Sequence, residues 1–141
     1  MSTCWVCVDA NMVVRLVADP TDKVVSALWA QWNERRQPMT APALLPYEVT
    51  NALYRYQKLG YMTAESARSA LKAALALPVR FYTDLQLHEE ARRLAERFSL
   101  PSAYDAYYLA LAERLSGEFW TLDGRLARAV QPSLSWVHLA E

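Results

Sequence analysis

The chain has 141 residues, of which 53% are hydrophobic and 21% charged, and its 15 basic and 15 acidic side chains give a formal net charge of zero. This composition excludes an intrinsically disordered chain, and the balanced charge disfavours strong non-specific binding to nucleic acid. No apolar run approaches the roughly 18 residues that cross a bilayer, and the stretch MSTCWVCVDANMVVRL lacks the basic start of a signal peptide. We therefore expect a single domain over residues 1–141, located in the cytoplasm.

Strands and helices alternate along the chain, and their order indicates the fold class. Strands separated by helices imply parallel pairing through right-handed crossovers, so the sequence predicts a three-layer α/β/α sandwich with a central, mainly parallel sheet. The predicted strands cover residues 4–9, part of 39–46, 79–82, 118–123 and 134–139, and the predicted helices cover about residues 12–18, 21–36, 46–60, 64–77, 85–98, 103–117 and 124–130.

Polar residues with short side chains precede several of the predicted helices and predict their N-caps. The last long helix, AYDAYYLALAERLSG, is apolar almost all round, which predicts that it is buried. The N-cap candidates are Asp19, Thr21 and Asp22 for the helix at 21–36, and Thr63, Asp84 and Ser102 for the helices at 64–77, 85–98 and 103–117.

The two cysteines, Cys4 and Cys7, have the C-x-x-C spacing of redox and zinc sites. In a strand, residues three apart point to opposite faces, whereas redox motifs of this spacing begin a helix, where the thiol pKa is lowered. Two thiols also cannot complete a tetrahedral zinc site, and the sequence has no His/Cys cluster beside them. We expect both to be thiols of a core strand.

Four acidic residues occupy unusual places. Asp9 ends the first strand and Asp123 ends the strand EFWTL. Because ligands bind beyond the carboxyl ends of the strands in an open parallel sheet, we expect both side chains at one edge. Glu48 lies on the apolar stripe of the helix LLPYEVTNALYRY, where a lone carboxylate is costly to bury. Asp105 is the only acid in the first two turns of its helix and shares a face with Tyr108.

Each acid also has a structural interpretation. The three aspartates can cap helices, and Asp105 can do so in a capping box with Ser102. Glu48 can be neutralised by Lys58 or by an arginine elsewhere. Taken singly, three of the four acids favour a structural role. Taken together, four acids at helix starts and strand ends on one side of a parallel sheet indicate a shared site.

Four converging carboxylates would repel one another and raise each other's pKa. A hard divalent cation removes this cost, and a site with only oxygen ligands is typical of Mg²⁺ or Mn²⁺. Open coordination positions can hold phosphate oxygens and activate a water molecule. The predicted metal ligands are Asp9, Glu48, Asp105 and Asp123, with Asn11 and Thr121 as neutral neighbours that orient the site.

The chain resembles the PIN-domain ribonucleases, and within them the toxin subunits of VapBC-type toxin–antitoxin pairs. The resemblance lies in four stretches that occur in the family's order between residues 6 and 130, and YDAYYLALA is the most telling piece. The stretches are VDANMVVRL, LLPYEVTNAL, SAYDAYYLALAERL and FWTLDGRLARA.

The resemblance implies a metal-dependent endoribonuclease that hydrolyses RNA phosphodiester bonds in line and leaves 5′-phosphate and 3′-hydroxyl ends. The four acids fall on the family's acidic positions, and Asn11 falls on a small polar position that is often Ser or Thr. By likeness, Asp9 and Asp105 would be the primary ligands of Mg²⁺ (or Mn²⁺). Glu48 and Asp123 would complete the pocket and help to bind a second metal or to position water.

The resemblance also implies three partners: an RNA substrate, a second copy of the chain in a homodimer, and a small antitoxin whose tail occupies the acidic groove. Aromatic residues that look exposed in the sequence suit such contacts, and packing inside the domain explains them equally well. These residues are Trp29, Trp32, Tyr54, Tyr56 and Tyr61.

Two other functions remain open. A PIN-like domain with an idle site could serve as a protein-interaction module, although an idle site has no reason to keep four repelling acids. A metal-dependent DNA nuclease or phosphatase of similar fold would share the site and differ only in substrate. P-loop chemistry is excluded, because the sequence contains no G-x-x-x-x-G-K-[ST] motif.

Overall fold

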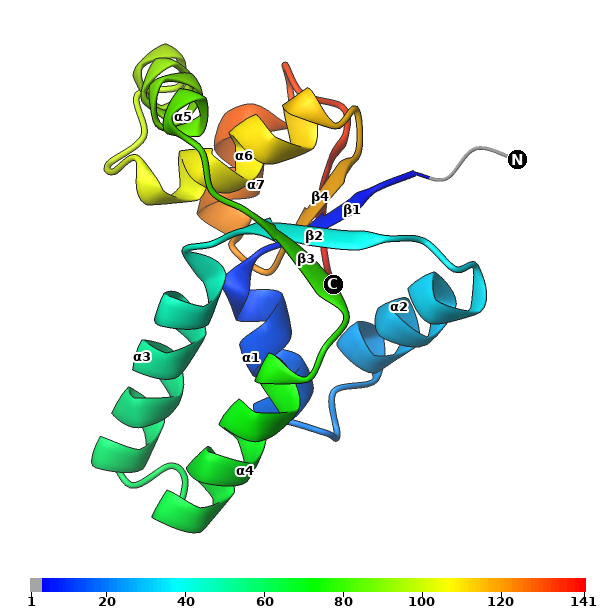
Figure 1. Ribbon diagram of the computed structural model, residues 1–141, viewed down its shortest axis with the longest axis vertical. Helices are drawn as coiled ribbons and strands as arrows, with labels where there is room; N and C mark the ends of the chain where they lie inside the picture. The colour runs from blue at the N-terminus through cyan, green and yellow to red at the C-terminus, as the bar shows by residue number, and fades with distance from the viewer. Residues whose placement is uncertain (1–3) are drawn as a thin grey trace.

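A sheet of parallel strands forms the centre of the structure, a computed structural model that describes residues 4–141 (Figure 1). The strands are β1 (Val6–Val8), β2 (Met39–Pro42), β3 (Val79–Tyr82), β4 (Glu118–Thr121) and β5 (Val137–Leu139). Their order across the sheet is β3-β2-β1-β4-β5, and each neighbouring pair is parallel, as predicted. Residues 1–3 of the predicted domain lie outside the described residues.

Helices cover both faces of the sheet and complete the predicted three layers (Figure 1). One face carries α1 (Ala10–Ala18), α2 (Lys23–Glu34), α3 (Leu45–Lys58) and α4 (Ala64–Leu75). The other face carries α5 (Leu85–Arg97), α6 (Tyr104–Arg114) and α7 (Gly124–Val130). In the part of the chain that the structure describes, no helix has both the length and the apolar character needed to cross a membrane.

Predicted N-caps account for the starts of three helices and fail at a fourth. Three predicted N-caps form, each accepting a backbone N–H at 3.0 Å: Asp22 for α2, Thr63 for α4 and Asp84 for α5. The prediction for Ser102 is wrong, because α6 begins at Tyr104 and Ala103 takes the N-cap position without a side-chain cap. Ser102 lies one residue too early to form a capping box, which leaves the Asp105 carboxylate free for other contacts.

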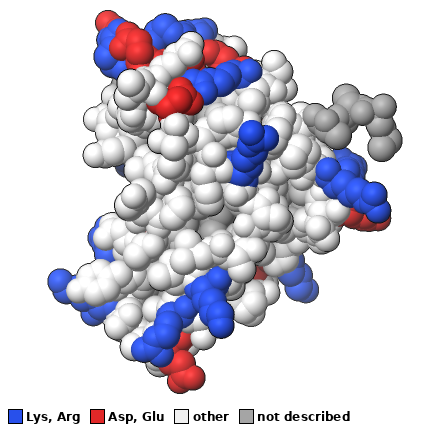
Figure 2. All heavy atoms as spheres, in the orientation of Figure 1, with Lys and Arg blue, Asp and Glu red and all other residues white. Residues whose placement is uncertain are grey.

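The outer face of α5 carries charged side chains that pair with one another (Figure 2). Arg92 bonds to Glu89 at 2.7 Å and to Glu96 at 2.9 Å, one turn away on either side. Arg114 of α6 bonds to Asp84 at 2.8 Å. The acidic residues of this surface are therefore neutralised by adjacent arginines.

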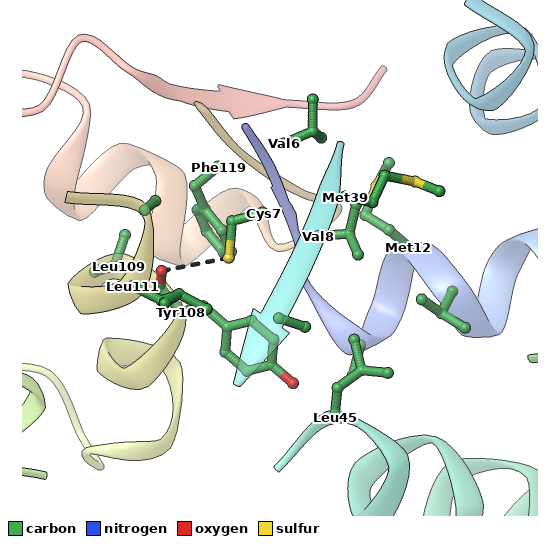
Figure 3. Close-up of a cluster of buried hydrophobic side chains, with 14 of the residues drawn as sticks. Val6, Cys7, Val8, Met12, Met39, Leu45, Tyr108, Leu109, Leu111 and Phe119 are labelled. Atoms are coloured by element: carbon green, nitrogen blue, oxygen red, sulfur yellow. Dashed lines mark hydrogen bonds between the residues drawn. The ribbon is translucent and has the colours of Figure 1, made fainter. Parts of the chain in front are cut away.

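The central strand β1 is buried on both faces (Figure 3). All three of its residues are fully enclosed, with α6 on one side and Met12 of α1 on the other. The Cys7 thiol donates a weak hydrogen bond to the backbone carbonyl of Tyr108 at 3.5 Å (Figure 3). Cys7 is thus the predicted core thiol, whereas Cys4 precedes β1 and is only half-buried. Both cysteines are free.

Of the five aromatic residues for which partner contact and internal packing were equally good explanations, two are buried inside the domain. Trp29 and Trp32 of α2 pack against each other with ring centroids 5.1 Å apart, and Trp32 meets Trp120 of β4 edge-on at 5.8 Å. Residues three apart share one face of a helix, and here that face is turned towards the sheet, which accounts for the burial of both. The three tyrosines of the same set are exposed.

The strand order brings together the ends of two strands that are distant in sequence. The chain runs outward from β1 through β2 to β3, and then crosses back to β4 and β5 on the other side of β1. β1 and β4 are therefore neighbours at the point where the strand order reverses. In open α/β sheets, ligands bind in the crevice beyond the carboxyl ends of the strands at this switch point. The residues that follow Val8 and Thr121 lie at this place.

Gly117 lies just before β4, close to the start of β1, and we predict that Gly117→Ala destabilises the fold. A Cβ atom here would collide with the backbone carbonyl oxygen of Trp5, which cannot move without shifting β1. We expect the free energy of unfolding, measured by chemical denaturation, to fall by about 1–3 kcal/mol. Gly124→Ala is the control, because its Cβ would meet only the flexible end of Arg128. An equal loss in the two variants would contradict this explanation.

Candidate functional site

A pocket of about 470 Å³ opens at the switch point, and all four predicted acidic residues line it. They reach it from four parts of the fold. Asp9 follows β1, Glu48 lies in the first turn of α3, Asp105 lies in the first turn of α6, and Asp123 directly precedes α7. The structure thus brings together every acid selected from the sequence. We name this cavity the acidic pocket.

The Thr121 hydroxyl, fully buried at the end of β4, ties the two strand ends together. It donates to Oδ2 of Asp9 at 2.8 Å, and it accepts the N–H of Asp123 at 3.0 Å and the side-chain amide of Asn11 at 3.2 Å. Asn11 also donates to Oδ2 of Asp9 at 3.3 Å and accepts the N–H of Leu122 at 3.0 Å. Both neutral residues selected from the sequence therefore contact Asp9 and hold it without supplying a positive charge.

The two aspartates at the strand ends differ in how far they act as helix caps. Asp123 accepts the N–H groups of Arg125 and Leu126 at 3.0 and 3.2 Å, both on Oδ1, so its structural interpretation as the N-cap of α7 is confirmed. Its Oδ2 is left for other contacts. Asp9 occupies the N-cap position of α1, but its side chain makes no capping bond. Helix capping therefore does not explain the buried carboxylate of Asp9.

Glu48 is held by Tyr108, a residue that was not selected from the sequence as part of the site. The buried Tyr108 hydroxyl on α6 donates to Oε1 of Glu48 on α3 at 2.6 Å. Burial, together with the charge on Glu48, raises the pKa of Tyr108 far above its usual range, so the phenol keeps its proton. Within residues 4–141 Glu48 forms no ion pair, so neutralisation by Lys58 or an arginine is wrong. One feature of the sequence could have identified Tyr108 as part of the site: a tyrosine inside a buried apolar helix needs a hydrogen-bond partner for its hydroxyl.

Burial and nearby negative charge raise the pKa of three carboxylates in the acidic pocket, those of Asp9, Glu48 and Asp105. Burial raises the pKa of Asp9 to about 7, against the hydrogen bond from Thr121. The charges on Asp105 and Glu48 add to this rise. The pKa of Glu48 is raised by burial and by Asp105, and that of Asp105 by burial and by Asp123. Within the described chain none of these four carboxylates pairs with lysine or arginine, in contrast to the acids of α5.

The donors of the acidic pocket fit a hydrated divalent cation. The described residues that line it offer carboxylate and amide oxygens and the Tyr56 hydroxyl, but neither thiol nor imidazole, and such oxygen ligands are what Mg²⁺ and Mn²⁺ prefer. Arg15 also lines the pocket, and its guanidinium is paired with Asp22 at 2.9 Å. Bound positive charge would also relieve the repulsion that raises the pKa values. Within residues 4–141, no three Asp, Glu, His or Cys side chains converge closely enough to hold one ion directly. Mg²⁺ does not require such convergence, because it keeps several of its waters and binds through one or two carboxylates.

Comparison with known families identifies this chain. The sequence model of the PIN domain matches residues 6–131, a span that includes all four acids of the acidic pocket. The chain belongs to the PIN-domain family.

The relatives of this PIN domain include proteins named ribonuclease VapC3. The one from Mycobacterium tuberculosis is 36% identical over 126 residues, which cover 88% of this chain and 86% of that protein. The one from Pyrobaculum aerophilum is 34% identical over 89 residues, which cover 60% of this chain and 65% of that protein, slightly under two thirds of its length. Among solved structures, a chain of a toxin–antitoxin complex from Klebsiella pneumoniae matches with a TM-score of 0.67 and 17% identity, over 96% of this chain and 98% of that one. That likeness confirms the predicted α/β sandwich.

Replacing Asp9 by Asn should stabilise this PIN domain in the absence of metal. Folding raises the pKa of Asp9 from 3.8 to about 7, so the folded state binds the proton more tightly than the unfolded state. The free energy of unfolding therefore falls as the pH rises from 3.8 to about 7. At higher pH the full destabilisation by the Asp9 carboxylate is present. We expect Asp9→Asn to gain roughly 2–4 kcal/mol at pH 8 in EDTA, and markedly less at pH 5.

Chemical denaturation of the wild type and the variant at the two pH values measures this difference. Glu34→Gln, at the exposed end of α2, is the matched control for removal of one negative charge. A gain in Asp9→Asn that is the same at both pH values, or that Glu34→Gln reproduces, would contradict the assignment of the cost to the buried carboxylate.

Proposed function

We propose that this PIN domain is a metal-dependent endoribonuclease of the cytoplasm that acts as the toxin of a toxin–antitoxin pair. The observation that carries the proposal is the acidic pocket, in which four carboxylates gather at the switch point of the sheet without a basic partner in the described chain. The relatives named ribonuclease VapC3 support RNA as the substrate. The structural neighbour taken from a toxin–antitoxin complex supports the biological role.

Asp9 and Asp105 are the residues that we assign as primary ligands of Mg²⁺ or Mn²⁺. Thr121 and Asn11 fix the Asp9 carboxylate, and the buried helix α6 fixes the backbone of Asp105. When bound, the ion would neutralise charge on the phosphate and lower the pKa of a water molecule. Because Thr121 and Asn11 are neutral, they orient Asp9 and leave its negative charge for the ion.

Glu48 and Asp123 would orient the water that attacks the phosphate or accept its proton. Tyr108 occupies Oε1 of Glu48, so Oε2 is the oxygen that can orient this water or accept its proton. Asp123 has the same arrangement, with Oδ1 bonded to the start of α7 and Oδ2 left for the site. Each carboxylate is thus anchored by one oxygen and can use the other.

An antitoxin segment would reach the acidic pocket along a groove beside α1. A neighbouring cavity shares Val14, Arg15 and Tyr56 with the acidic pocket and extends to Tyr61, which is 74% exposed. A surface of aromatic, apolar and charged side chains, the last being Arg15 and Asp19, therefore leads to the carboxylates. A segment with apolar side chains on this groove and a basic side chain in the acidic pocket would block RNA and cation together.

We also propose that two copies of the chain form a homodimer. Tyr54 of α3 and Leu75 of α4 are both exposed and line a shallow surface away from the acidic pocket. No described part of this chain covers that surface, and a second copy would do so. Light scattering should give the mass of two chains, and the mass of one chain at micromolar concentration would contradict the dimer.

Cleavage of RNA should require the divalent cation and the acidic pocket. Loss of a group that only orients a metal ligand typically reduces activity 10- to 100-fold, so loss of a ligand should exceed about 100-fold. We expect Asp9→Asn and Asp105→Asn to lose more than about 100-fold in rate, and EDTA to abolish cleavage. The measurement uses labelled single strands of RNA and DNA of one sequence, with Mg²⁺ and with EDTA.

The outcomes of this experiment separate the candidate functions. Strong cleavage in EDTA, or equal residual activity in wild type and variants, would contradict the metal-dependent mechanism. Preference for DNA would favour the related DNA nuclease or phosphatase. A folded wild type that cleaves nothing and still binds an antitoxin would favour the idle interaction module.

Tyr108→Phe should weaken the site and leave the fold intact. The change keeps the buried ring and removes the hydroxyl that donates to Glu48. We expect about 10- to 100-fold lower activity and a higher Mg²⁺ concentration at half-maximal rate. Tyr47→Phe, an exposed tyrosine next to Glu48, is the control. Unchanged activity and unchanged metal dependence in Tyr108→Phe would show that this hydrogen bond is not used.

A further inference from the structure

A second cavity, of about 250 Å³, opens at the carboxyl ends of β2 and β3. Three tyrosines give it its walls: Tyr82 at the end of β3, and Tyr104 and Tyr107 in the first turn of α6. Leu87 and His88 of α5 close one side. We name this cavity the tyrosine pocket.

The tyrosine pocket and the acidic pocket are built from the same two helix starts. On α6, Tyr104 lines the tyrosine pocket and the next residue, Asp105, lines the acidic pocket. On α3, Leu44 just before the helix lines the tyrosine pocket, and Glu48, one turn later, lines the acidic pocket. The two pockets therefore lie next to each other along the carboxyl edge of the sheet.

The tyrosine pocket suits a flat, uncharged group with polar edges. None of the described residues that line it is a lysine or an arginine, so it offers no cation for a phosphate. Its one carboxylate, Asp84, is engaged by Arg114 at 2.8 and 3.0 Å and by the start of α5. Polar atoms remain where Nδ1 of His88 meets the Tyr107 hydroxyl at 2.6 Å. Tyr104 is 60% exposed, so its ring is available to a ligand.

We propose that the tyrosine pocket binds one unpaired base of the RNA, next to the phosphate that the acidic pocket holds; this rests on the proposed ribonuclease function. Proteins recognise single-stranded RNA by stacking unpaired bases on aromatic side chains and by hydrogen bonds to the base edges. Tyr104 supplies the ring, and the pair of His88 and Tyr107 supplies polar atoms for the edge. A nucleotide carries both a base and a phosphate. Tyr104 and Asp105 are adjacent on α6 and line different pockets, so the start of this helix would contact the base through Tyr104 and the phosphate site through Asp105.

An RNA base is favoured over a protein side chain as the occupant because of where the cavity lies. The groove that leads from the acidic pocket to Tyr61 runs along α1 and α3, whereas the tyrosine pocket opens beside α5 and α6. RNA bound across the carboxylates would also contact the tyrosine pocket. An antitoxin could fill the groove beside α1 without entering the tyrosine pocket.

Cleavage of a random pool of single-stranded RNA, read by sequencing the product ends, tests the proposal. Wild type should prefer one base at a fixed position beside the cut. Tyr104→Ala should reduce kcat/KM roughly 10-fold or more and flatten that preference, because it removes the stacking surface. Tyr104→Phe should behave like wild type. Phe81→Ala is the matched control: Phe81 is exposed on β3, but its side chain points to the opposite face from Tyr82.

A binding experiment keeps this test separate from the test of the nuclease. Labelled RNA oligonucleotides with one abasic position at a time are titrated into Asp9→Asn, with and without Tyr104→Ala. We expect one abasic position to weaken binding roughly 10-fold or more, and Tyr104→Ala to remove that difference. This result would support the tyrosine pocket even if wild type cleaved no RNA, which by itself would count against the proposed function.

Three results would overturn the proposal. The first is a folded Tyr104→Ala variant with the kcat/KM and base preference of wild type. The second is an equal loss in Phe81→Ala. The third is unchanged RNA cleavage by Tyr104→Ala with weaker binding of an antitoxin, which would assign the tyrosine pocket to a protein partner.

Discussion

The constraint on which this structure depends is the enclosure of the Asp9 carboxylate by donors that carry no charge. Asp9 is 6% exposed, and burial and neighbouring acids raise its pKa to about 7. An arginine or lysine in contact with Asp9 would offset the cost of burying its charged carboxylate. The same contact would also remove the attraction of the site for a cation. The chain instead uses a hydroxyl and an amide, from Thr121 and Asn11, which orient the carboxylate and leave its charge unneutralised. The contrast with α5, where arginines pair with the acids, shows that the chain does supply basic partners elsewhere.

The fold supplies the rigidity that this arrangement needs. β1 is enclosed on both faces, and α6 is buried along most of its length, so the backbones that carry Asp9 and Asp105 are fixed by packing. Thr121 reaches Asp9 only because β4 pairs with β1 in parallel register, which places the two strand ends side by side. A site built on such elements keeps its geometry before a ligand arrives, and preorganised charge is the main way in which a protein stabilises a transition state.

Much of this could be predicted from the sequence because it follows from local patterns and topology. Alternating strands and helices fix a parallel sheet, and a parallel sheet gathers strand-end residues such as Asp9 and Asp123 at one edge. Contacts between side chains of distant elements have no such local pattern. The bond from Tyr108 to Glu48 joins α6 to α3 and needs both helix positions to be known. Sequence patterns also allow alternatives that only packing decides, as for Trp29, which an amphipathic helix could turn inward or outward.

In the proposed function, the two pockets would together divide recognition of RNA between its backbone and its bases. Contacts to phosphates position a nucleic acid, and contacts to bases carry the sequence information. A strongly basic surface would hold any RNA tightly, but this chain has zero formal net charge and therefore little of that general attraction. In this proposal, binding energy would come from the carboxylates through a cation and from stacking on Tyr104. Because stacking acts on a base and not on a phosphate, a protein of this composition gains affinity mainly where it also gains selectivity.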